Sequence, residues 1–307
     1  MKAIRMHEPT GISALVYEEV PDAKPTLGDV LVKVAACGIT HTELDWPLWT
    51  CRAGHHRTTI IPGHEVSGVV AALGFGTAGI AVGDEVFGLT DQLRDGAAAE
   101  YVAVEARNLA PKPRTVDHVH AAAVPRAGLT AWQALFDHGK LTSGQTVVIH
   151  GAGGAVGSTA VQLARWAGAQ VIGTGRNHSR ALVTELGADR FIALDADGLE
   201  DLAGQADVVF DTIGGDVLAH SPALLKPEGT LVPVATQPPS SQDTLNEVAL
   251  VHFIQEANRD QLIELARLVD EGHLRPQVGA VYPLAEAAEA YGAKAAGGIA
   301  GRTVLQP

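Results

Sequence analysis

A short glycine-rich stretch lies between an apolar run and a helix-like segment in the middle of the chain. The apolar run Val147–His150 leads into Gly151–Gly157, which has the sequence Gly-Ala-Gly-Gly-Ala-Val-Gly, and Ser158–Trp166 follows. Glycines let the backbone turn sharply and approach a pyrophosphate, and a helix N-terminus offers free N–H groups to that charge. This context is the one that the motif needs, so we expect a dinucleotide site rather than a plain glycine-rich corner. Its expected contacts are Gly151, Gly153, Gly154, Ala155, Val156 and Gly157.

The end of the following apolar run bears on which nicotinamide dinucleotide is bound. Val171–Thr174 is followed by Gly175 and Arg176. An NAD site usually places Asp or Glu here, where it accepts from the ribose 2′-hydroxyl, and this chain has no acid at that place. The guanidinium of Arg176 can instead pair with a 2′-phosphate, and Gly175 gives it room. We therefore predict NADPH, with contacts from Thr174, Gly175 and Arg176; the alternative is a solvated arginine on a loop.

Thiol and imidazole side chains between residues 37 and 64 raise the question of a metal site. They are Cys37, His41, Cys51, His55, His56 and His64. Their spacing matches no common ligand pattern, and scattered histidines are usually solvated or hydrogen-bonded, so we expect no metal. The two cysteines are interpreted as free thiols in a reducing compartment, and we expect a cytoplasmic protein.

Strands and helices are predicted to alternate between residues 146 and 235. Apolar runs typical of strands are Thr146–His150, Gln170–Thr174, Arg190–Leu194, Asp207–Asp211 and Gly229–Ala235. Segments with helical spacing are Ala155–Trp166, Ser179–Leu186 and Val217–Leu225. Such alternation implies a parallel sheet with right-handed crossovers, the doubly wound arrangement of a Rossmann domain.

The chain before this block has the pattern of a β-rich domain. Short apolar runs punctuated by Gly, Pro and Asp suggest a barrel or sandwich; they are Val30–Ala36, Val66–Leu73, Glu85–Leu89 and Glu100–Val104. A helix is expected over Ala121–Phe136. The tail has too few elements for a domain of its own: a run at 248–254, helices at 259–271 and 284–296, and strands at 280–282 and 302–305. We therefore predict one β-rich domain from residues 1–118 and 255–307, with a cofactor domain over 119–254.

The charge balance excludes one class of partner. The 307 residues carry a formal net charge of −13 and no run of Lys or Arg, whereas a surface that follows nucleic-acid phosphates needs clustered cations. The N-terminus has no apolar core like that of a signal peptide, and charges or Pro interrupt every apolar run before it reaches the length of a membrane span. We expect a small-molecule partner, with neither nucleic acid nor membrane.

Three further stretches resemble the medium-chain dehydrogenase/reductase superfamily. They are Ala36–Glu43 (ACGITHTE), Pro62–Gly68 (PGHEVSG) and Ala127–Leu135 (AGLTAWQAL), and with the glycine-rich stretch and Gly301–Leu305 the similarity covers nearly the whole chain. Within the superfamily the chain is most similar to the zinc-free quinone oxidoreductases, the zeta-crystallin-like branch. The resemblance implies an α/β protein with a GroES-like, β-rich catalytic domain, a Rossmann domain, an active site in the cleft between them and a homodimer.

By the same resemblance, further side chains would surround the cofactor. Thr130 would lie beside the nicotinamide. The residues that would line the cofactor channel are Ile213, Ala235, Thr236, Phe253 and Ile254. Arg302 is a further candidate for a cofactor contact.

Zinc-dependent members of the superfamily bind the metal with a Cys, a His and a second Cys. In this chain those three positions are Thr40, His64 and Arg126. Two thiolates are therefore missing, and a guanidinium cannot ligate Zn²⁺. Hydride addition to an enone or quinone builds negative charge on the carbonyl oxygen, and that charge needs stabilisation. We expect Arg126 to supply positive charge there, held by Glu65; the alternative is that the two form only a structural ion pair.

Neighbouring side chains complete the expected catalytic set. Thr40, His41 or His64 could donate a hydrogen bond or a proton to the reacting oxygen. Trp46 offers an indole on which a flat acceptor would stack, and we expect it as a pocket wall. The predicted activity is hydride transfer from NADPH to a quinone or an α,β-unsaturated carbonyl without zinc. Two alternatives stay open: a zinc-type alcohol dehydrogenase, and a non-catalytic NADPH-binding protein with a structural or regulatory role.

Overall fold

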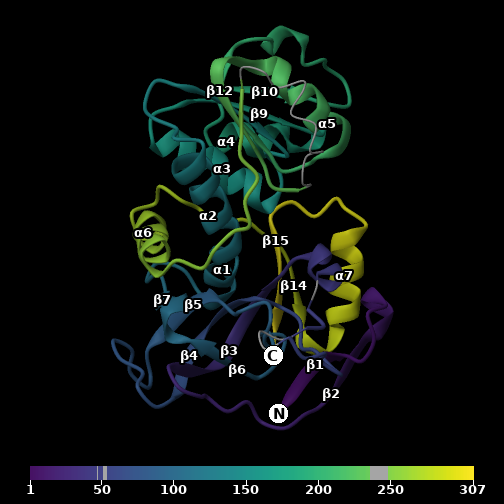
Figure 1. Cartoon of the computed structure of the whole chain (residues 1–307), viewed down its shortest axis with the longest axis vertical. Helices are drawn as coiled ribbons and strands as arrows, with labels where there is room; N and C mark the ends of the chain where they lie inside the picture. Colours follow the sequence, from purple (N-terminus) through teal and green to yellow (C-terminus); the bar gives the residue numbers. More distant parts are fainter. Residues whose placement is uncertain (47, 51–53, 236–247) are drawn as a thin grey trace. The chain divides into compact units, whose positions relative to one another are not determined.

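A computed structural model of the chain describes residues 1–46, 48–50, 54–235 and 248–307, and it divides the chain into two compact units (Figure 1). The first unit comprises Met1–Arg126, Ala257–Glu271 and Pro276–Pro307, and the second comprises Ala127–Glu256 and Gly272–Arg275. Both ends of the chain belong to the first unit. The sequence places the domain boundaries after residues 118 and 254, whereas the chain divides after residues 126 and 256, and a short segment at 272–275 returns to the second unit.

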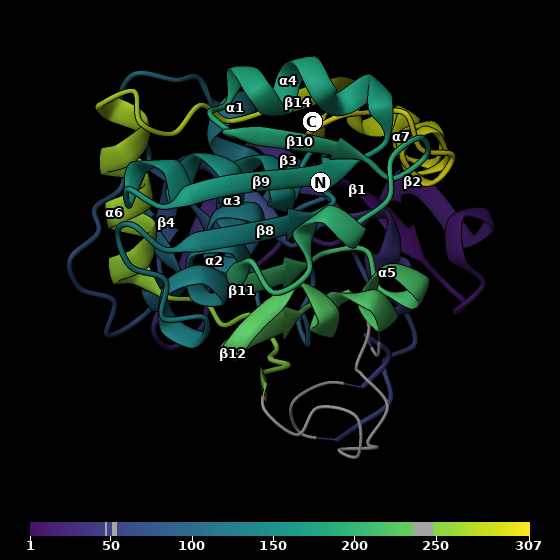
Figure 2. The same ribbon diagram turned by 90° about the horizontal axis from the view of Figure 1, so that it is seen from above.

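The second unit is built on a six-stranded parallel sheet. Its strands are β8 (Thr146–His150), β9 (Gln170–Gly175), β10 (Arg190–Ala193), β11 (Ala206–Asp211), β12 (Leu225–Pro233) and β13 (Ala249–Leu250). They lie in the order β10-β9-β8-β11-β12-β13, and Figure 2 shows the first five side by side. The chain starts in the middle of the sheet, builds one edge and then returns to build the other, which is the doubly wound order. The predicted Rossmann fold is confirmed.

Three α-helices connect strands of this sheet: α3 (Ala155–Trp166), α4 (Arg180–Glu185) and α5 (Gly215–His220). The helix α3 buries one face, which includes Val161 and Ala164, and packs against β8 and β9. The helix α4 packs against β10. None of the helices that the structure describes, in either unit, is long and apolar enough to cross a membrane.

Two predicted helices are interrupted at prolines. The expected helix over residues 217–225 is wrong at its end, because α5 stops at residue 220, a 3-10 turn covers 221–224 and β12 begins at 225. Pro222 lies at this break, and proline has no N–H with which to continue the helix. The expected helix over 121–136 is divided into α1 (His118–Ala122), α2 (Pro125–Trp132) and a π-helix at Gln133–His138. Pro125 starts α2, where a missing N–H costs nothing.

A seven-stranded sheet forms the core of the first unit. Its strands are β3 (Asp29–Ile39), β4 (Glu65–Leu73), β5 (Glu85–Leu89), β6 (Tyr101–Glu105), β7 (Leu109–Pro111), β14 (Val278–Pro283) and β15 (Arg302–Gln306). They lie in the order β14-β15-β3-β4-β5-β7, and β6 pairs with β3. A separate antiparallel pair is formed by β1 (Lys2–Met6) and β2 (Leu15–Glu19). The sequence predicts strands at β3 to β6, β14 and β15, and it misses β1, β2 and β7, of which β7 has only three residues.

The strand β3 connects the two ends of the chain. Its alternate residues Val30, Val32 and Val34 are buried, while Lys33 is exposed, as expected for a strand with one face in the core. It pairs antiparallel with β4 and β6, and its last residues, 37–39, pair with β15. This pairing brings the start of β15 next to the end of β3.

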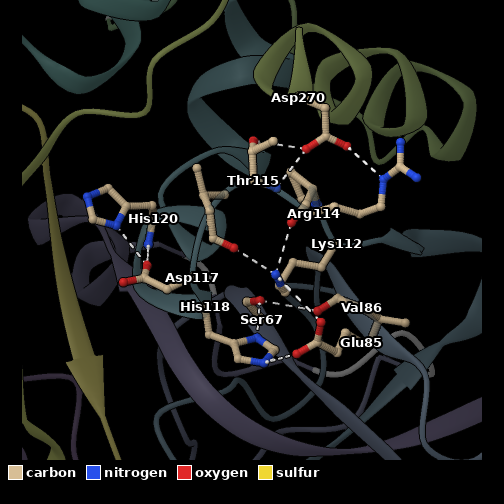
Figure 3. Close-up of polar contacts among 12 residues, drawn as sticks. Ser67, Glu85, Val86, Lys112, Arg114, Thr115, Asp117, His118, His120 and Asp270 are labelled. Atoms are coloured by element: carbon tan, nitrogen blue, oxygen red, sulfur yellow. Dashed lines mark hydrogen bonds and ion pairs between the residues drawn. The ribbon is translucent and has the colours of Figure 1, made fainter. Parts of the chain in front are cut away.

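A polar network holds α6 (Arg259–Asp270) to the segment that leads into α1 (Figure 3). Asp270 accepts hydrogen bonds from the backbone N–H and the hydroxyl of Thr115, at 2.9 and 3.0 Å, and pairs with Arg114 at 3.6 Å. Lys112 donates to two backbone carbonyls of the same segment. The network therefore fixes the end of α6 within the first unit.

Polar contacts of α1 and a core side chain of α7 (Ala287–Ala295) attach both helices to the first unit. His118, at the start of α1, contacts Ser67 of β4 through Nδ1 at 2.8 Å and Glu85 of β5 through Nε2 at 3.1 Å (Figure 3). Burial lowers the pKa of His118, against the carboxylate of Glu85, which raises it. The helix α7 contributes Tyr291 to the main hydrophobic core.

Candidate functional site

The glycine-rich corner after β8 is too tightly packed for side chains at three of its positions. A Cβ at Gly151, whose φ is +75°, would lie 2.3 Å from Oγ1 of Thr212. A Cβ at Gly153 would lie 2.4 Å from Oγ of Ser179, and one at Gly157 would lie 2.1 Å from the carbonyl oxygen of Gly151. These contacts explain the spacing of the glycines, because each one allows backbone to approach its neighbour closely.

The helix after this corner begins without a side-chain cap. Gly154 is the N-cap of α3, no side chain bonds to the free N–H groups of the first turn, and that turn contains no acidic residue. Gly154 is exposed, and Ala155 and Val156 are half-buried. Uncapped N–H groups and the positive end of the helix dipole suit an anion, so the corner fits the pyrophosphate of a dinucleotide.

Buried polar residues lie in register where the strands beneath this corner end. Thr174 of β9, His150 of β8 and Asp211 of β11 are neighbours across the sheet, and the hydroxyl of Thr174 lies 2.7 Å from Nδ1 of His150. Burial lowers the pKa of His150 to about 4. Asp211 accepts from the N–H groups of Ile213 and Gly214, at 2.7 and 2.9 Å, and so shapes the loop after β11. Sequence reasoning missed His150 and Asp211 as members of this site.

Arg176 and Arg180, which follow β9, differ in the hydrogen bonds and ion pairs that their side chains form. Arg180 donates to Oδ1 of Asn177 at 3.1 Å and to the carbonyl of Phe191 at 3.0 Å, and pairs with Asp197 at 3.3 Å. Arg176 is exposed, and its side chain has no hydrogen bond or ion pair with any residue that the structure describes. Arg176 therefore has the more available guanidinium. A Cβ at position 175 would meet only the Phe191 ring, at an ordinary 3.7 Å.

The remaining predicted cofactor residues of the second unit differ in exposure. Thr130, on α2, is buried, and Ala235 and Ile254 are exposed. The ring of Phe253 lies 4.4 Å from that of His138 in the π-helix. Thr236 lies outside the described residues. Their contact with a cofactor stays a prediction.

In the first unit, a buried ion pair joins the start of β15 to β4. Oε2 of Glu65 lies 3.0 Å from Nε of Arg302, and the two side chains are 1% and 4% exposed. Arg302 also donates through Nη1 to Oγ1 of Thr40 at 2.7 Å. The other carboxylate oxygen of Glu65 accepts from the backbone N–H of Arg126 at 3.0 Å. Arg302, predicted from resemblance as a cofactor contact, thus orders Thr40 and Glu65 within its own unit.

A second buried carboxylate holds the other side of Thr40. Oε1 of Glu43 accepts from the Thr40 N–H at 3.0 Å and from the hydroxyl of Tyr291 at 2.7 Å. Burial raises the pKa of Glu43, although both hydrogen bonds act against the rise, and burial also raises the pKa of Tyr291. Thr40-x-x-Glu43 is a capping-box pattern, a signal that the sequence carried and that could have identified Glu43. Nothing local could have identified Tyr291.

Trp46 lies against two of the predicted catalytic residues. Its ring stacks on that of His64, with centroids 6.1 Å apart and planes at 24°, and the guanidinium carbon of Arg126 lies 4.6 Å from its centroid. Burial lowers the pKa of Arg126, while the carboxylates of Glu65 and Glu43 raise it. Cation and indole together form a positively charged, partly aromatic surface. The side chain of His41 lies outside what the structure describes.

The three positions that bind zinc in zinc-dependent relatives do not fit that metal here. Oγ1 of Thr40 accepts a hydrogen bond from Arg302, and Arg126 carries a guanidinium. His64 alone has a side chain that commonly ligates Zn²⁺. Among the described residues no three His, Cys, Asp or Glu side chains are placed to hold a metal ion.

Comparison with known proteins agrees with this architecture. Residues 26–114 match the alcohol dehydrogenase GroES-like domain, and residues 186–305 match the zinc-binding dehydrogenase family. The chain is 29% identical to an NADPH-dependent alkenal/one oxidoreductase, chloroplastic, of Arabidopsis thaliana, over 100% of this chain and 80% of that protein. It is 31% identical to a probable zinc-binding oxidoreductase, mitochondrial, of Arthroderma benhamiae, over 96% and 93%.

Solved structures are similar over the whole chain. The quinone oxidoreductase from Coxiella burnetii superposes with a TM-score of 0.90 at 27% identity, over 100% of this chain and 99% of that one. A mycobacterial protein complexed with NADPH gives 0.88 at 27%, and an NAD-dependent alcohol dehydrogenase gives 0.87 at 27%, each over 100% of both chains.

The chain belongs to the medium-chain dehydrogenase/reductase superfamily. It combines a GroES-like domain with a Rossmann domain, as predicted, and the expectation of an oxidoreductase is confirmed. The individual site residues stay predictions, and their roles are argued below.

Proposed function

We propose that this protein transfers hydride from NADPH to a quinone or an α,β-unsaturated carbonyl without zinc. The observation that carries the proposal is the guanidinium of Arg126, stacked on Trp46 at a position where zinc-dependent relatives have a metal ligand. A fixed cation beside a flat aromatic surface suits an acceptor that is planar and whose oxygen gains negative charge. Relatives and similar structures named for quinone and alkenal/one reduction support this acceptor class.

The glycine-rich corner and Arg176 support the choice of cofactor. The N–H groups at the start of α3 would bind the pyrophosphate, and the available guanidinium of Arg176 would bind a 2′-phosphate. When bound, NADPH supplies the hydride. The alternative cofactor is NADH, and the similarity to a solved NAD-dependent alcohol dehydrogenase supports that alternative.

Residues of the first unit would act on the acceptor. Arg126 would stabilise the oxygen on which charge develops, and Trp46 would stack on the ring or enone plane. Because Arg302 donates to Oγ1 of Thr40, the Thr40 hydroxyl can use its own hydrogen to donate a hydrogen bond to the acceptor oxygen. Glu65 and Glu43 balance the cations, since an uncompensated buried charge is costly.

The test is an assay of the purified protein with NADPH and a panel of quinones and enones. Turnover is measured as the loss of NADPH absorbance. We expect turnover without added metal and unaffected by a chelator. Oxidation of alcohols that needs stoichiometric zinc would instead identify a zinc-type alcohol dehydrogenase. Tight binding of NADPH without turnover of any acceptor would identify a non-catalytic binding protein.

We also propose a cytoplasmic homodimer. The superfamily resemblance supports the dimer, and the thiol chemistry supports a reducing compartment. Light scattering after size-exclusion chromatography tests the dimer, and a mass equal to one chain would contradict it. Localisation of the full-length protein by fractionation tests the compartment.

A further inference from the structure

His64 is buried with one of its ring nitrogens satisfied and the other without a partner. It lies immediately before β4, is 1% exposed, and its Nδ1 is 2.7 Å from Oγ1 of Thr90, immediately after β5. The Thr90 N–H also donates to the His64 carbonyl at 3.1 Å, continuing the β4–β5 ladder. Nε2 of His64 has no hydrogen-bond partner within the described part of the chain. A buried polar atom without a partner is unusual and points to a ligand.

The hydrogen bonds available to the Thr90 hydroxyl indicate which ring nitrogen of His64 carries the proton. Thr90 is 5% exposed, and its hydroxyl proton needs an acceptor. The one side-chain partner that the structure gives this hydroxyl is Nδ1 of His64. If Nδ1 carried the ring proton, the buried hydroxyl proton would have no acceptor. The hydroxyl therefore donates to Nδ1, and the ring proton lies on Nε2.

The surroundings of His64 keep the ring neutral. Burial lowers its pKa to about 3, and the cations Arg126 and Arg57 act in the same direction. A neutral imidazole offers Nε2–H as a hydrogen-bond donor but has no acidic proton to release at ordinary pH. The stacked Trp46 ring, which also contacts Arg126, places this donor in the same cluster as the proposed oxyanion cation.

We propose that Thr90 is a positioning residue that holds His64 in its Nε2–H tautomer, so that this N–H is a further donor, beside Arg126 and Thr40, to the carbonyl oxygen of the acceptor. This inference rests on the proposed function. In the step, the hydride and its electron pair reach the conjugated carbon, and the carbonyl π electrons move onto oxygen. No bond to the His64 proton breaks, so the enolate takes its proton from water, and the adduct of a quinone becomes the hydroquinone by a further proton shift through water. The cluster then serves acceptors whose reduced anion is stable enough to be protonated by solvent.

The first test reads the tautomer directly and does not depend on turnover. Protein labelled with ¹⁵N in its imidazole rings is examined by two-bond ¹H–¹⁵N correlation spectra, with His64→Asn used to assign the signal. We expect the Nε2–H tautomer for His64 in the wild type and in Thr90→Ser, which keeps the hydroxyl. Thr90→Val removes the donor to Nδ1, and we expect the Nδ1–H form to become populated. An Nδ1–H tautomer in the wild type overturns the inference.

The second test separates positioning from structure by kinetics. Thr90→Val is expected to lower kcat for enone or quinone reduction by about tenfold to hundredfold, with KM for NADPH unchanged. This is less than the roughly 10²- to 10³-fold for loss of a whole oxyanion donor, because part of the population keeps the Nε2–H tautomer. Thr90→Ser keeps the hydroxyl, so its kcat should stay within about twofold of the wild-type value. Thr303→Val is the matched control, because Thr303 is buried in the same unit and its hydroxyl has no partner among the described residues.

Each failure identifies a different error. Unchanged kcat in Thr90→Val, or an equal loss in Thr90→Val and Thr303→Val, overturns the positioning role. No turnover of any acceptor by the wild type overturns the proposed function and the acceptor contact with it. The tautomer spectrum then still decides whether Thr90 sets the protonation of His64.

Discussion

Arg126 is the side chain on which the proposed chemistry depends most. Arg126→Leu removes the cation and its contact with Trp46, while the ion pair of Glu65 with Arg302 remains. We expect kcat to fall by about 10²- to 10³-fold, because the charge on the acceptor oxygen loses its main partner. The dissociation constant for NADPH, measured by calorimetry, should stay within about twofold, because the pyrophosphate corner is untouched. A leucine variant with full turnover would leave Arg126 a purely structural role.

Arg176 carries the prediction about cofactor choice. Arg176→Ser should weaken NADPH binding by about 1.5–3 kcal/mol, the range for a charge-assisted contact, and leave NADH binding unchanged. Arg180→Ser is the matched control, since Arg180 is already engaged by Asn177, Phe191 and Asp197. It should alter both affinities by the same factor. Equal affinity of the wild type for NADH and NADPH would contradict the assignment.

Residues of the two sites differ in how far the sequence alone predicts them. The glycines at 151, 153 and 157 follow a local rule, because each one serves a close approach within one strand-turn-helix unit. The contact of Thr90 with His64 joins positions 26 residues apart, and that of Tyr291 with Glu43 joins positions 248 apart. No spacing rule links such residues. They become neighbours only when β4 pairs with β5 and when α7 packs on the core.

The glycine corner between β8 and α3 allows a matched pair of alanine substitutions. Gly157→Ala would place a Cβ 2.1 Å from a backbone oxygen, which cannot move without distorting the turn, whereas Gly154→Ala would meet the same atom at 3.3 Å. We expect Gly157→Ala to destabilise the second unit by about 1–3 kcal/mol and to abolish NADPH binding. Gly154→Ala should cost less than about 1 kcal/mol. Urea unfolding and calorimetric titration measure both, and equal effects would contradict the packing argument.

Buried neutral histidines lie at the end of β8 and immediately before β4, and they predict acid sensitivity. The folded chain holds the pKa of His150 at about 4 and that of His64 at about 3, whereas in the unfolded chain both are near 6.5. Between pH 6.5 and 4 the unfolded state therefore binds more protons, so the free energy of unfolding falls as pH is lowered. Each histidine contributes a slope of about 1.4 kcal/mol per pH unit in that window.

Substitution of one histidine should flatten that dependence. His150→Gln is expected to lower stability at pH 7, because the contact with Thr174 is weakened. It should also remove the contribution of one histidine, about 1.4 kcal/mol per pH unit, from the slope between pH 6.5 and 4. Urea unfolding at half-unit pH intervals measures it. His178→Gln is the control, since His178 is exposed and should leave the slope unchanged. A flat profile in the wild type would show that these rings are protonated in the folded protein.

Elements were predictable where their pattern was local. The strand β8 and the helix α3 have the bounds that periodicity predicts, because buried apolar runs and a glycine start define both. The sequence analysis predicts one continuous helix over residues 121–136 and misses its division, although Pro125 marks the start of α2. The sequence analysis expects the tail to complete the first domain but does not predict the antiparallel pairing of β15 with β3, because strand order depends on contacts between opposite ends of the chain.

The division of the chain into two units sets how its stability should respond to mutation. The cofactor corner belongs wholly to one unit, and the Arg126, Thr40 and His64 cluster wholly to the other. Composition and alternation indicated two domains, but the boundary after Arg126 lies within a helical segment, α2, where no change of pattern marks it. Because each unit has its own buried core, damage to one core should leave ligand binding by the other unit largely intact.

Two leucines test that independence. Leu305 of β15 is fully buried in the first unit, and Leu231 of β12 is 2% exposed in the second. Leu305→Ala and Leu231→Ala should each destabilise their own unit by about 2–5 kcal/mol, through lost apolar contact and a residual cavity. Hydrogen exchange resolved by peptide should show faster exchange mainly in the mutated unit. NADPH affinity should stay within about twofold in Leu305→Ala and fall in Leu231→Ala, because binding stabilises only a folded site. Loss of NADPH binding in Leu305→Ala alone would mean that the cofactor site depends on the first unit.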